Sequence, residues 1–494
     1  MLRNHRRPVP EPVAQGAVNA RRPGGNKTPM RSLFGPALAV LVLSCGGTSD
    51  GSPLVPPADA GPKLDAAAKP SALYEQLTIS EIAVYQTVKI DVMKGGASID
   101  ERNAPIVTAK RGILRVWVDF PKTKTPWRAR ALDAELRLVN AAGDQVLTDR
   151  KTIARASDDD TFDSTFDFAF DEAVLTPDTR FELTVRDPLL VASGGDKLGT
   201  LHFPTGIGVT EPLGVSANPG PIKLVIVPVQ FQGWLPDTTP VQLERYRTEL
   251  LDLYPAASVE ISVRAPIVAT TTDWYQVLTQ IAGTRAADAP APDVYYAGSW
   301  EPGASYTDYL KSGSIAGLGT LGGRTSLILG YSGSTSPETL AHELGHNMGR
   351  AHAPCGNPAG VDELYPYSGA SLGVNGWSTS LQQLVPESES DVMSYCQPTW
   401  VSDYTYAALF ANIRATYPQH DAVGIAPAER YRRIWIDPKG AMHDGGIVVE
   451  SPVGGTPTAQ GLFFPLDHLP GGYLLVPADR VGTVGSLQLP PTGK

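Results

Sequence analysis

Residues 336–352 read SPETLAHELGHNMGRAH, and this stretch decides how the central part of the chain folds. His342 and His346 lie four residues apart, so a helix presents both imidazoles on one face. Two imidazoles on one helical face can bind a single zinc ion through Nε2 or Nδ1. Glu343 lies beside them and points toward the water that such a metal would hold. We therefore expect a helix that carries a Zn2+ site with a carboxylate next to it.

The ends of this expected helix are marked as well. Ser336 and Pro337 suit the N-cap and the first helical position. Gly349 suits a left-handed residue just past the C-terminal end, where the chain can turn sharply. After that turn His352 can return as a third ligand, which leaves the fourth coordination position open for water.

The segment HELGHNMGRAH follows the pattern H-E-x-x-H-x-x-G-x-x-H, and on these residues the chain resembles the metzincin zinc metalloendopeptidases. The resemblance implies an α/β metzincin-like catalytic domain, a mixed twisted sheet with an active-site helix. It also implies that His342, His346 and His352 hold Zn2+. Glu343 would be the general base. Two other interpretations are helix-surface histidines without a metal and an inactive zinc-binding relic, and the intact Glu343 argues against the relic.

The segment DVMSYC at 391–396 resembles the methionine turn that lies beneath the metal of metzincins. The resemblance makes Met393 the apolar floor of the zinc site and not a ligand, whereas the alternative is a methionine of the core. Tyr395 resembles a tyrosine that in some metzincins contacts zinc or stabilises the oxyanion. Simple packing is the alternative role for Tyr395.

Two of the three cysteines follow these motifs. Cys355 lies three residues after His352, and Cys396 lies three residues after Met393. If His352 and Met393 converge on one metal, the two cysteines become neighbours, and an oxidising compartment would join them in a disulfide. The alternative is a pair of free buried thiols.

The N-terminal segment predicts export. The apolar run 38–43 before Cys45 resembles a bacterial lipobox, which implies a signal peptide over 1–44 and acylation of the Cys45 sulfur. Met30 is an alternative start. We expect a lipoprotein of the bacterial outer membrane or cell surface, anchored in the membrane through Cys45 or released from it; an ordinary secretory signal is the alternative. Residues 45–72, rich in Gly, Pro, Ala and Asp, suit an extended tether.

Folded parts are expected after the tether. Period-two alternation of apolar residues, as in 114–120, 132–138 and 166–170, predicts a β-sandwich over 73–205. Strands and helices then alternate over 206–424, the predicted zinc domain. Expected there are strands at 222–229, 259–263, 294–297 and 325–329, a helix from Pro240 and a second one near Trp274.

Short apolar runs at the C-terminal end predict a small β module over 425–494. His420, His443 and His468 have no mutual ligand spacing, so we expect surface histidines. A mature chain from Cys45 has 34 basic and 50 acidic side chains, a formal charge of −16. This charge argues against nucleic acid as a partner. We expect a monomer.

The stretches GVDELYPYSG, LGVNGW and DVMSYCQPTWVSDYTY look similar to a group of bacterial secreted metallopeptidases that includes mucin-cleaving enzymes. This resemblance implies zinc ligation and peptide hydrolysis, but it does not carry the mucin preference. The expected substrates are extracellular proteins or glycoproteins. The alternatives are a surface glycan- or protein-binding lipoprotein with an accessory or inactive zinc domain, and a metal-dependent amidase. Residues 313–323 are either a sheet edge on which an extended peptide pairs or a flexible loop.

Overall fold

The computed structural model describes residues 71–122, 127–333, 335–417, 429–436, 441–450, 456–457, 462–465 and 472–477. The chain divides into two compact units, Met1–Ala67 and Ala68–Lys494, and every described residue belongs to the second. The predicted signal peptide with Met30, the predicted lipidation site Cys45 and nearly all of the predicted tether lie outside the described residues. His420 and His468 also lie outside them.

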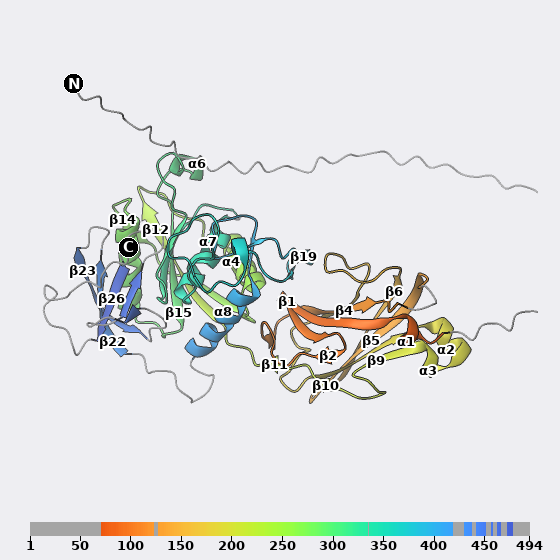
Figure 1. Ribbon diagram of the computed structural model, residues 1–494. Helices are drawn as coiled ribbons and strands as arrows, with labels where there is room; N and C mark the ends of the chain where they lie inside the picture. The colour runs from red at the N-terminus through yellow and green to blue at the C-terminus, as the bar shows by residue number, and fades with distance from the viewer. Residues whose placement is uncertain are drawn as a thin grey trace, which may run out of the picture. The chain divides into compact units, whose positions relative to one another are not determined.

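Two antiparallel sheets make up the first part of the described chain (Figure 1). One has the order β19-β18-β1-β4-β7, with β2 also pairing β1, and the other has the order β10-β8-β5-β6, with β9 also pairing β8. The strands of the first sheet are β1 (Thr78–Lys94), β2 (Ala97–Ser98), β4 (Gly112–Asp119), β7 (Phe166–Phe170), β18 (Gly376–Ser378) and β19 (Gln383–Val385). Those of the second are β5 (Arg130–Asn140), β6 (Gly143–Ile153), β8 (Arg180–Arg186), β9 (Thr200–Phe203) and β10 (Glu211–Pro212). The predicted alternation is confirmed in β5 and β7, where every second side chain is buried. It is not seen in β4, where all residues from Gly112 to Val118 are buried.

The first sheet takes two strands from far along the chain. The hairpin of β18 and β19 follows the histidine motif in sequence, yet β18 pairs with β1 through Thr87 opposite Trp377 and Val88 opposite Gly376. These strands fall inside the range 206–424 that the sequence assigns to the zinc domain. Short elements complete this part: α1 (Leu73–Gln76), α2 (Pro188–Gly194), α3 (Asp196–Gly199), β3 (Ile106–Val107) and β11 (Val215–Ser216).

The central sheet is mixed and has the order β13-β12-β15-β17-β16, with β14 also pairing β12. Its parallel strands are β12 (Ile222–Phe231), β13 (Val259–Val263), β14 (Ile267–Ala269), β15 (Val294–Trp300) and β17 (Thr325–Leu329), and β16 (Gly317–Gly319) is the antiparallel edge. The strands expected from the sequence are confirmed. For residues 313–323, the strand β16 is present at the sheet edge.

Helices lie against both faces of the central sheet. They are α4 (Pro240–Leu253), α5 (Trp274–Asp288), α7 (Thr335–Asn347) and α8 (Asp403–Thr416), with the short α6 (Tyr306–Tyr309) and η1 (Ser368–Ala370) in loops. Ile226 of β12 belongs to the core that contains buried residues of α4, α7 and α8, whereas its neighbour Val227 belongs to the core around α5. Alternate residues of a strand point to opposite faces, so both faces of β12 are covered.

Helix α7 begins earlier than the sequence indicates. It starts at Thr335, so Ser336 and Pro337 lie inside the first turn. The Ser336 hydroxyl accepts a hydrogen bond from Gln242 of α4 at 2.9 Å and donates to the Tyr331 carbonyl at 3.3 Å. The predicted N-cap role of Ser336 is therefore wrong, because this hydroxyl ties α7 to its neighbours instead of capping it.

The C-terminal strands form a further sheet in the order β23-β22-β26-β25-β24. They are β22 (Glu429–Ile436), β23 (Met442–Glu450), β24 (Thr456–Pro457), β25 (Leu462–Pro465) and β26 (Gly472–Pro477). Two short strands outside this sheet, β20 (Ser390–Asp391) and β21 (Thr399–Trp400), pair with each other. Tyr431 and Leu475 join the core cluster around α5.

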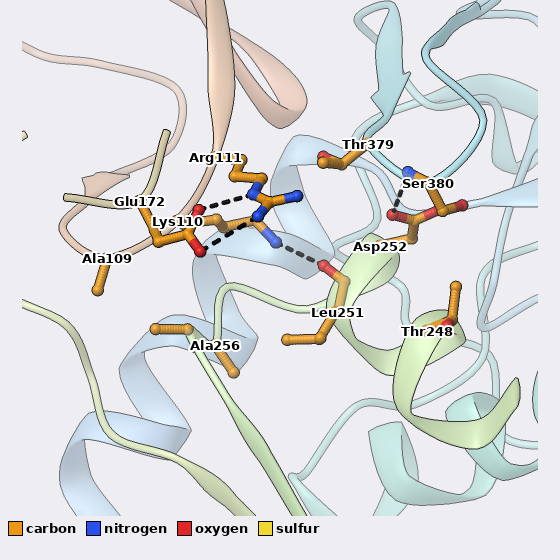
Figure 2. A pocket seen from close by; sticks show the side chains of 11 residues that line it. Ala109, Lys110, Arg111, Glu172, Thr248, Leu251, Asp252, Ala256, Thr379 and Ser380 are labelled. Carbon is orange, nitrogen blue, oxygen red and sulfur yellow. Dashed lines mark hydrogen bonds and ion pairs between the residues drawn. The ribbon is translucent and has the colours of Figure 1, made fainter. Parts of the chain in front are cut away.

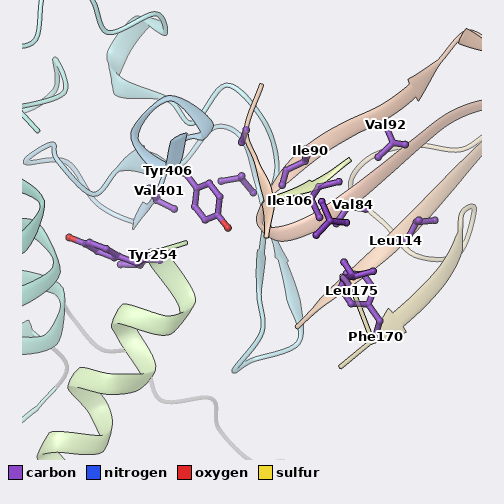
Figure 3. Close-up of a cluster of buried hydrophobic side chains, with 14 of the residues drawn as sticks. Val84, Ile90, Val92, Ile106, Leu114, Phe170, Leu175, Tyr254, Val401 and Tyr406 are labelled. Carbon is purple, nitrogen blue, oxygen red and sulfur yellow. The ribbon is translucent and has the colours of Figure 1, made fainter. Parts of the chain in front are cut away.

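One continuous hydrophobic core joins the antiparallel sheets to the central sheet and its helices. Figure 3 shows Val84 and Ile106 in the same cluster as Tyr254, Val401 and Tyr406. These residues are all fully buried. Burial at roughly 25 cal/mol per Å² of apolar surface makes such a shared core the main force that holds the two parts together.

A buried lysine crosses the same boundary. The Lys110 ammonium donates to the carbonyl of Leu251, at the C-terminal end of α4, at 2.6 Å (Figure 2). It also donates to the carbonyl of Tyr254, the next residue but two, at 3.0 Å. A cation suits the negative end of a helix dipole. Burial lowers the pKa of Lys110 to about 8, against the opposing attraction of Asp252.

Strand β1 contains a strained residue where it leaves β4 and meets β18. Thr87 has a φ of 74°. This is a left-handed conformation that costs an L-residue roughly 1–2 kcal/mol. The Thr87 side chain is fully buried, and its hydroxyl has no hydrogen-bond partner among the described residues. A β-branched residue in this conformation is a genuine outlier.

We predict that Thr87→Gly stabilises the protein. Glycine adopts positive φ freely and removes the unpaired hydroxyl, which together outweigh the lost methyl group and the greater freedom of the unfolded chain. The free energy of unfolding in urea should rise by about 1 kcal/mol. Thr184→Gly, at a buried strand position of β8, is the control and should lower it. A loss for Thr87→Gly as large as that for Thr184→Gly would contradict the prediction.

A second prediction concerns the packing of α4 against α7. Burial raises the pKa of Glu249 to about 7, and the negative charges of Glu338 and Asp252 contribute to this increase to a smaller extent. The folded protein therefore holds this proton more tightly than the unfolded chain, whose value is 4.5. The stability contributed by protonated Glu249 is complete below the unfolded value and is lost as pH rises through about 7.

Glu249→Gln should therefore be more stable than the parent in urea at pH 8, and this advantage should disappear at pH 5. Glu244→Gln changes an exposed carboxylate of the same helix and should affect stability alike at both pH values. Equal effects of Glu249→Gln at pH 5 and pH 8 would show that Glu249 ionises normally.

Candidate metal centre

The structure brings together the three histidines that the sequence singles out. Each of His342, His346 and His352 offers one ring nitrogen, and these nitrogens lie within 4.8 Å of one another. The Nε2 atoms of His342 and His346 are 3.0 Å apart. For the pair His342 and His346, bonds of about 2.0–2.1 Å from one ion to each nitrogen would be compatible with this distance. All three rings are buried, with 9%, 3% and 2% exposure respectively.

The turn that returns His352 to the site has the predicted conformation. Gly349 has a φ of 84°. Its N–H donates to the His346 carbonyl at 2.8 Å, and the Arg350 N–H donates to the Gly345 carbonyl at 2.9 Å. This pair of bonds is the Schellman arrangement at a helix C-terminus. The prediction that Gly349 ends the helix in a left-handed conformation is confirmed.

A backbone carbonyl contacts the back of each imidazole. The Nδ1 atoms of the three histidines lie 2.7 Å from Val392 O, 2.6 Å from Arg350 O and 2.5 Å from Ala359 O, in sequence order. A carbonyl oxygen only accepts hydrogen bonds, so each Nδ1 must carry the proton. In a neutral ring Nε2 then holds the lone pair, as metal-ligating histidines require.

This donor set fits a metal ion. Three neutral imidazoles direct lone pairs into one small buried volume, and two such nitrogens 3.0 Å apart repel each other unless a cation or proton lies between them. Transition metals such as zinc bind imidazole well. The prediction of a metal cofactor is confirmed to this extent: the histidine cluster can hold a metal ion.

Glu343 lies between the histidines and the sheet edge. It follows His342 on α7, is only 1% exposed and packs against β16. A Cβ atom on Gly317 would lie 2.3 Å from Glu343 Oε1, and one on Gly319 would lie 2.7 Å from Oε2. The same Cβ atom on Gly319 would also lie 3.3 Å from the Cβ atom of His346. The edge strand therefore needs glycines to pass this close to the carboxylate.

Met393 lies under the histidine face of α7. A Cβ atom on Gly345 would be 2.4 Å from the Met393 sulfur, so the thioether packs on the helix between His342 and His346. Met393 is only 1% exposed. This position agrees with the predicted apolar floor. Gly345, the residue directly before His346, has no side chain and so leaves room for the Met393 thioether. The motif permits any residue at this position and does not reveal this contact.

Asp391 orders the turn around Met393 and is a residue that the sequence interpretation missed. Its carboxylate accepts from the Met393 N–H at 2.8 Å and from the Ser402 N–H and hydroxyl at 2.9 and 2.5 Å. Ser402 is in turn the N-cap of α8. The signal available in the sequence is an acidic residue directly before Val392 and Met393, followed by a serine that precedes a helix.

The disulfide expected from the sequence is present between Cys355 and Cys396. The Tyr395 N–H also donates to the Cys355 carbonyl at 3.0 Å. The Tyr395 ring lies beside two metal-site rings, with centroids 4.9 Å from His352 and 5.9 Å from His342. Tyr395 is thus brought to the site, and whether it contacts substrate or only packs stays a prediction.

Arg350 and Asp362 hold the loop after the motif and were also missed. The Arg350 guanidinium lies 3.1 Å from the Asp362 carboxylate and stacks over the ring of Tyr404, whose hydroxyl donates to Asp362 at 3.0 Å. The Asp362 N–H donates to the His352 carbonyl at 2.8 Å. This network holds the His352 carbonyl and the Arg350 side chain in place.

Comparison with known proteins adds little to this geometry. No family model matches the chain, and no curated protein matches it. A calcium-binding mutant of Bacteroides uniformis β-glucuronidase 2 matches over 44% of this chain and 27% of that one, with 11% identity and a TM-score of 0.15. A candidate β-galactosidase of Bacteroides fragilis matches over 44% and 34%, with 10% identity and a TM-score of 0.13.

The chain spans about a third or less of the length of these two proteins, and the TM-scores are too low to relate the folds. In the part of the chain that the structure describes, no helix has both the length and the apolar character needed to cross a bilayer.

Proposed function

We propose that this protein is a zinc endopeptidase of the metzincin type, exported as a lipoprotein, that cleaves extracellular proteins or glycoproteins. The observation that carries the proposal is that three histidine Nε2 atoms converge beside the buried carboxylate of Glu343. In each ring a backbone carbonyl binds Nδ1, which makes Nε2 the nitrogen that can bind a metal. Three histidines with an open fourth position are the donor set of catalytic rather than structural zinc sites.

When bound, zinc would lower the pKa of water and polarise the carbonyl of a peptide bond. Glu343 accepts the proton of that water while the water oxygen attacks the carbonyl carbon. The same carboxyl then delivers the proton to the leaving nitrogen as the C–N bond breaks, which restores its charge. Tyr395, next to His342 and His352, is the candidate donor to the oxygen that becomes negative.

The substrate chain is proposed to lie along β16. This strand is the edge of the central sheet, and no further strand pairs with it among the described residues. An extended peptide can add to such an edge through backbone hydrogen bonds, which suits many sequences. Because Gly317 and Gly319 pass directly over Glu343, a peptide on this edge would be next to the proposed base.

The rival proposal is a glycan- or protein-binding lipoprotein whose metal site is accessory or inactive. It shares the metal site but does not need Glu343. The buried position of Glu343 against two glycines favours the peptidase, since a carboxylate is costly to bury without a role.

We predict that Glu343→Ala retains zinc but loses at least about 100-fold in kcat, because the proton acceptor is gone while the metal ligands remain. Cleavage of a casein and mucin-type glycoprotein panel by the purified protein, with zinc content measured in parallel, checks this. Glu338→Gln, a second carboxylate of α7, is the matched control and should cleave like the parent. Equal cleavage by Glu343→Ala and the parent would remove the peptidase mechanism. Zinc without cleavage by the parent would favour the binding lipoprotein.

A steric variant tests the edge strand. Gly317→Ala places a methyl group within 2.7 Å of Glu343 Cγ and of Thr339 Cγ2, so the carboxylate must move. We expect kcat to fall about tenfold or more with zinc content unchanged, since misplacement by about 1 Å costs rates of this size. Gly283→Ala on α5 is the control, because a methyl group there meets nothing within 4 Å. Unchanged kcat in Gly317→Ala would show that β16 does not position Glu343.

A further inference from the structure

Trp400 makes one of the contacts between the antiparallel sheets and the segment around the candidate metal site. The Trp400 indole N–H donates to the carbonyl of Thr87, in strand β1, at 2.9 Å. This is the strained residue of β1, whose left-handed conformation sets the direction of that carbonyl. Gly376 of β18 leaves room for the indole: a Cβ atom there would lie 2.6 Å from Trp400 Nε1 and 3.0 Å from Thr87 O.

The backbone of the same tryptophan leads to a metal-site histidine. The Trp400 carbonyl accepts from the Val392 N–H at 2.5 Å, where β20 and β21 pair. The Val392 carbonyl accepts from Nδ1 of His342 at 2.7 Å. Three successive hydrogen bonds therefore run from Thr87 to the ring of His342.

We propose that Trp400 is a positioning residue, which transmits the geometry of strand β1 to His342 through Val392. The inference rests on the proposed metal centre. The indole hydrogen bond holds β21 against strand β1. The backbone bond from Val392 to Trp400 then fixes the position of the Val392 carbonyl, and this carbonyl orients the imidazole of His342. Outer partners of metal-ligating histidines commonly affect metal affinity by 10- to 100-fold, and Trp400 acts one residue further out.

Other contacts hold the same segment but do not pass through Val392. Asn375 bridges the Lys89 N–H and the Glu387 N–H, and Asn103 donates to Asp403 of α8 at 2.9 Å. They keep the hairpin and α8 in place when the Trp400 hydrogen bond is removed. The loss can therefore be local, and the protein has other means to stay folded.

The test is the zinc dissociation constant, measured by chelator competition on the whole protein, together with the visible spectrum of the cobalt-loaded form. Trp400→Phe keeps an aromatic ring at this position but lacks the pyrrole half of the indole, and with it the N–H that donates to Thr87. We expect zinc to bind about tenfold more weakly and the cobalt bands to shift. Both readouts report the ligand geometry and do not depend on turnover.

Trp127→Phe is the matched control. The Trp127 indole also donates to a backbone carbonyl, that of Ile153, at 2.9 Å, in the sheet that does not contain β1. It should leave zinc affinity and the cobalt spectrum unchanged. Gly376→Ala serves as a second variant, because it displaces the indole while keeping Trp400, and it should weaken zinc binding in the same way.

Parent-like zinc affinity and cobalt spectra in both Trp400→Phe and Gly376→Ala would overturn the inference while leaving the metal centre intact. Equal weakening by Trp127→Phe would also overturn it, since the effect would then be general destabilisation. A parent protein that binds no zinc would instead remove the proposed metal centre, and the positioning role with it.

Discussion

The candidate metal centre depends on the requirement that three imidazoles turn the same nitrogen, Nε2, toward one point. A carbonyl behind each ring meets this requirement, and the carbonyls come from Val392, Arg350 and Ala359. Backbone carbonyls only accept hydrogen bonds, so they fix which nitrogen of a neutral ring carries the proton. The three carbonyls lie in segments between α7 and α8, so the structure around these segments determines where the carbonyls lie.

Two kinds of constraint act on the loops close to the site. The disulfide between Cys355 and Cys396 joins the segment after the third histidine to the methionine turn. It closes a loop with a sequence separation of 41 residues, which restricts the unfolded chain considerably. Asp391, fully buried, accepts three hydrogen bonds that link the methionine turn to α8. These bonds offset the cost of burying its charge.

Farther out, the antiparallel sheets take part in shaping the site. Strands β18 and β19 extend from the loop between the third histidine and the methionine turn, and they complete the sheet of β1. The core around Val84, Ile106 and Tyr406 is continuous across this boundary (Figure 3). An apolar core of this kind cannot be divided without exposing it, so the sheets and the metal site are expected to fold together.

By itself, the sequence determined the local features: the helix with His342 and His346, the turn at Gly349, the return of His352, the alternation in β5 and the strands of the central sheet. Each of these follows from spacing within a few residues, where side-chain periodicity and backbone preference act directly. The disulfide was expected only on the condition that His352 and the methionine turn, which was identified by the resemblance, converge on one metal, and the structure contains it. The metzincin assignment and the zinc remain proposals built on that local pattern.

Only the tertiary structure decided which distant groups meet. The tertiary contacts include the carbonyls behind the histidines, the glycines of β16 over Glu343, the pairing of Thr87 with Trp377 and the hydrogen bond from Trp400 to Thr87. They join residues up to 313 positions apart. A carbonyl is present in every residue, and a glycine can serve many purposes, so neither carries a sequence signal. Such contacts depend on how whole elements pack, which local spacing does not encode.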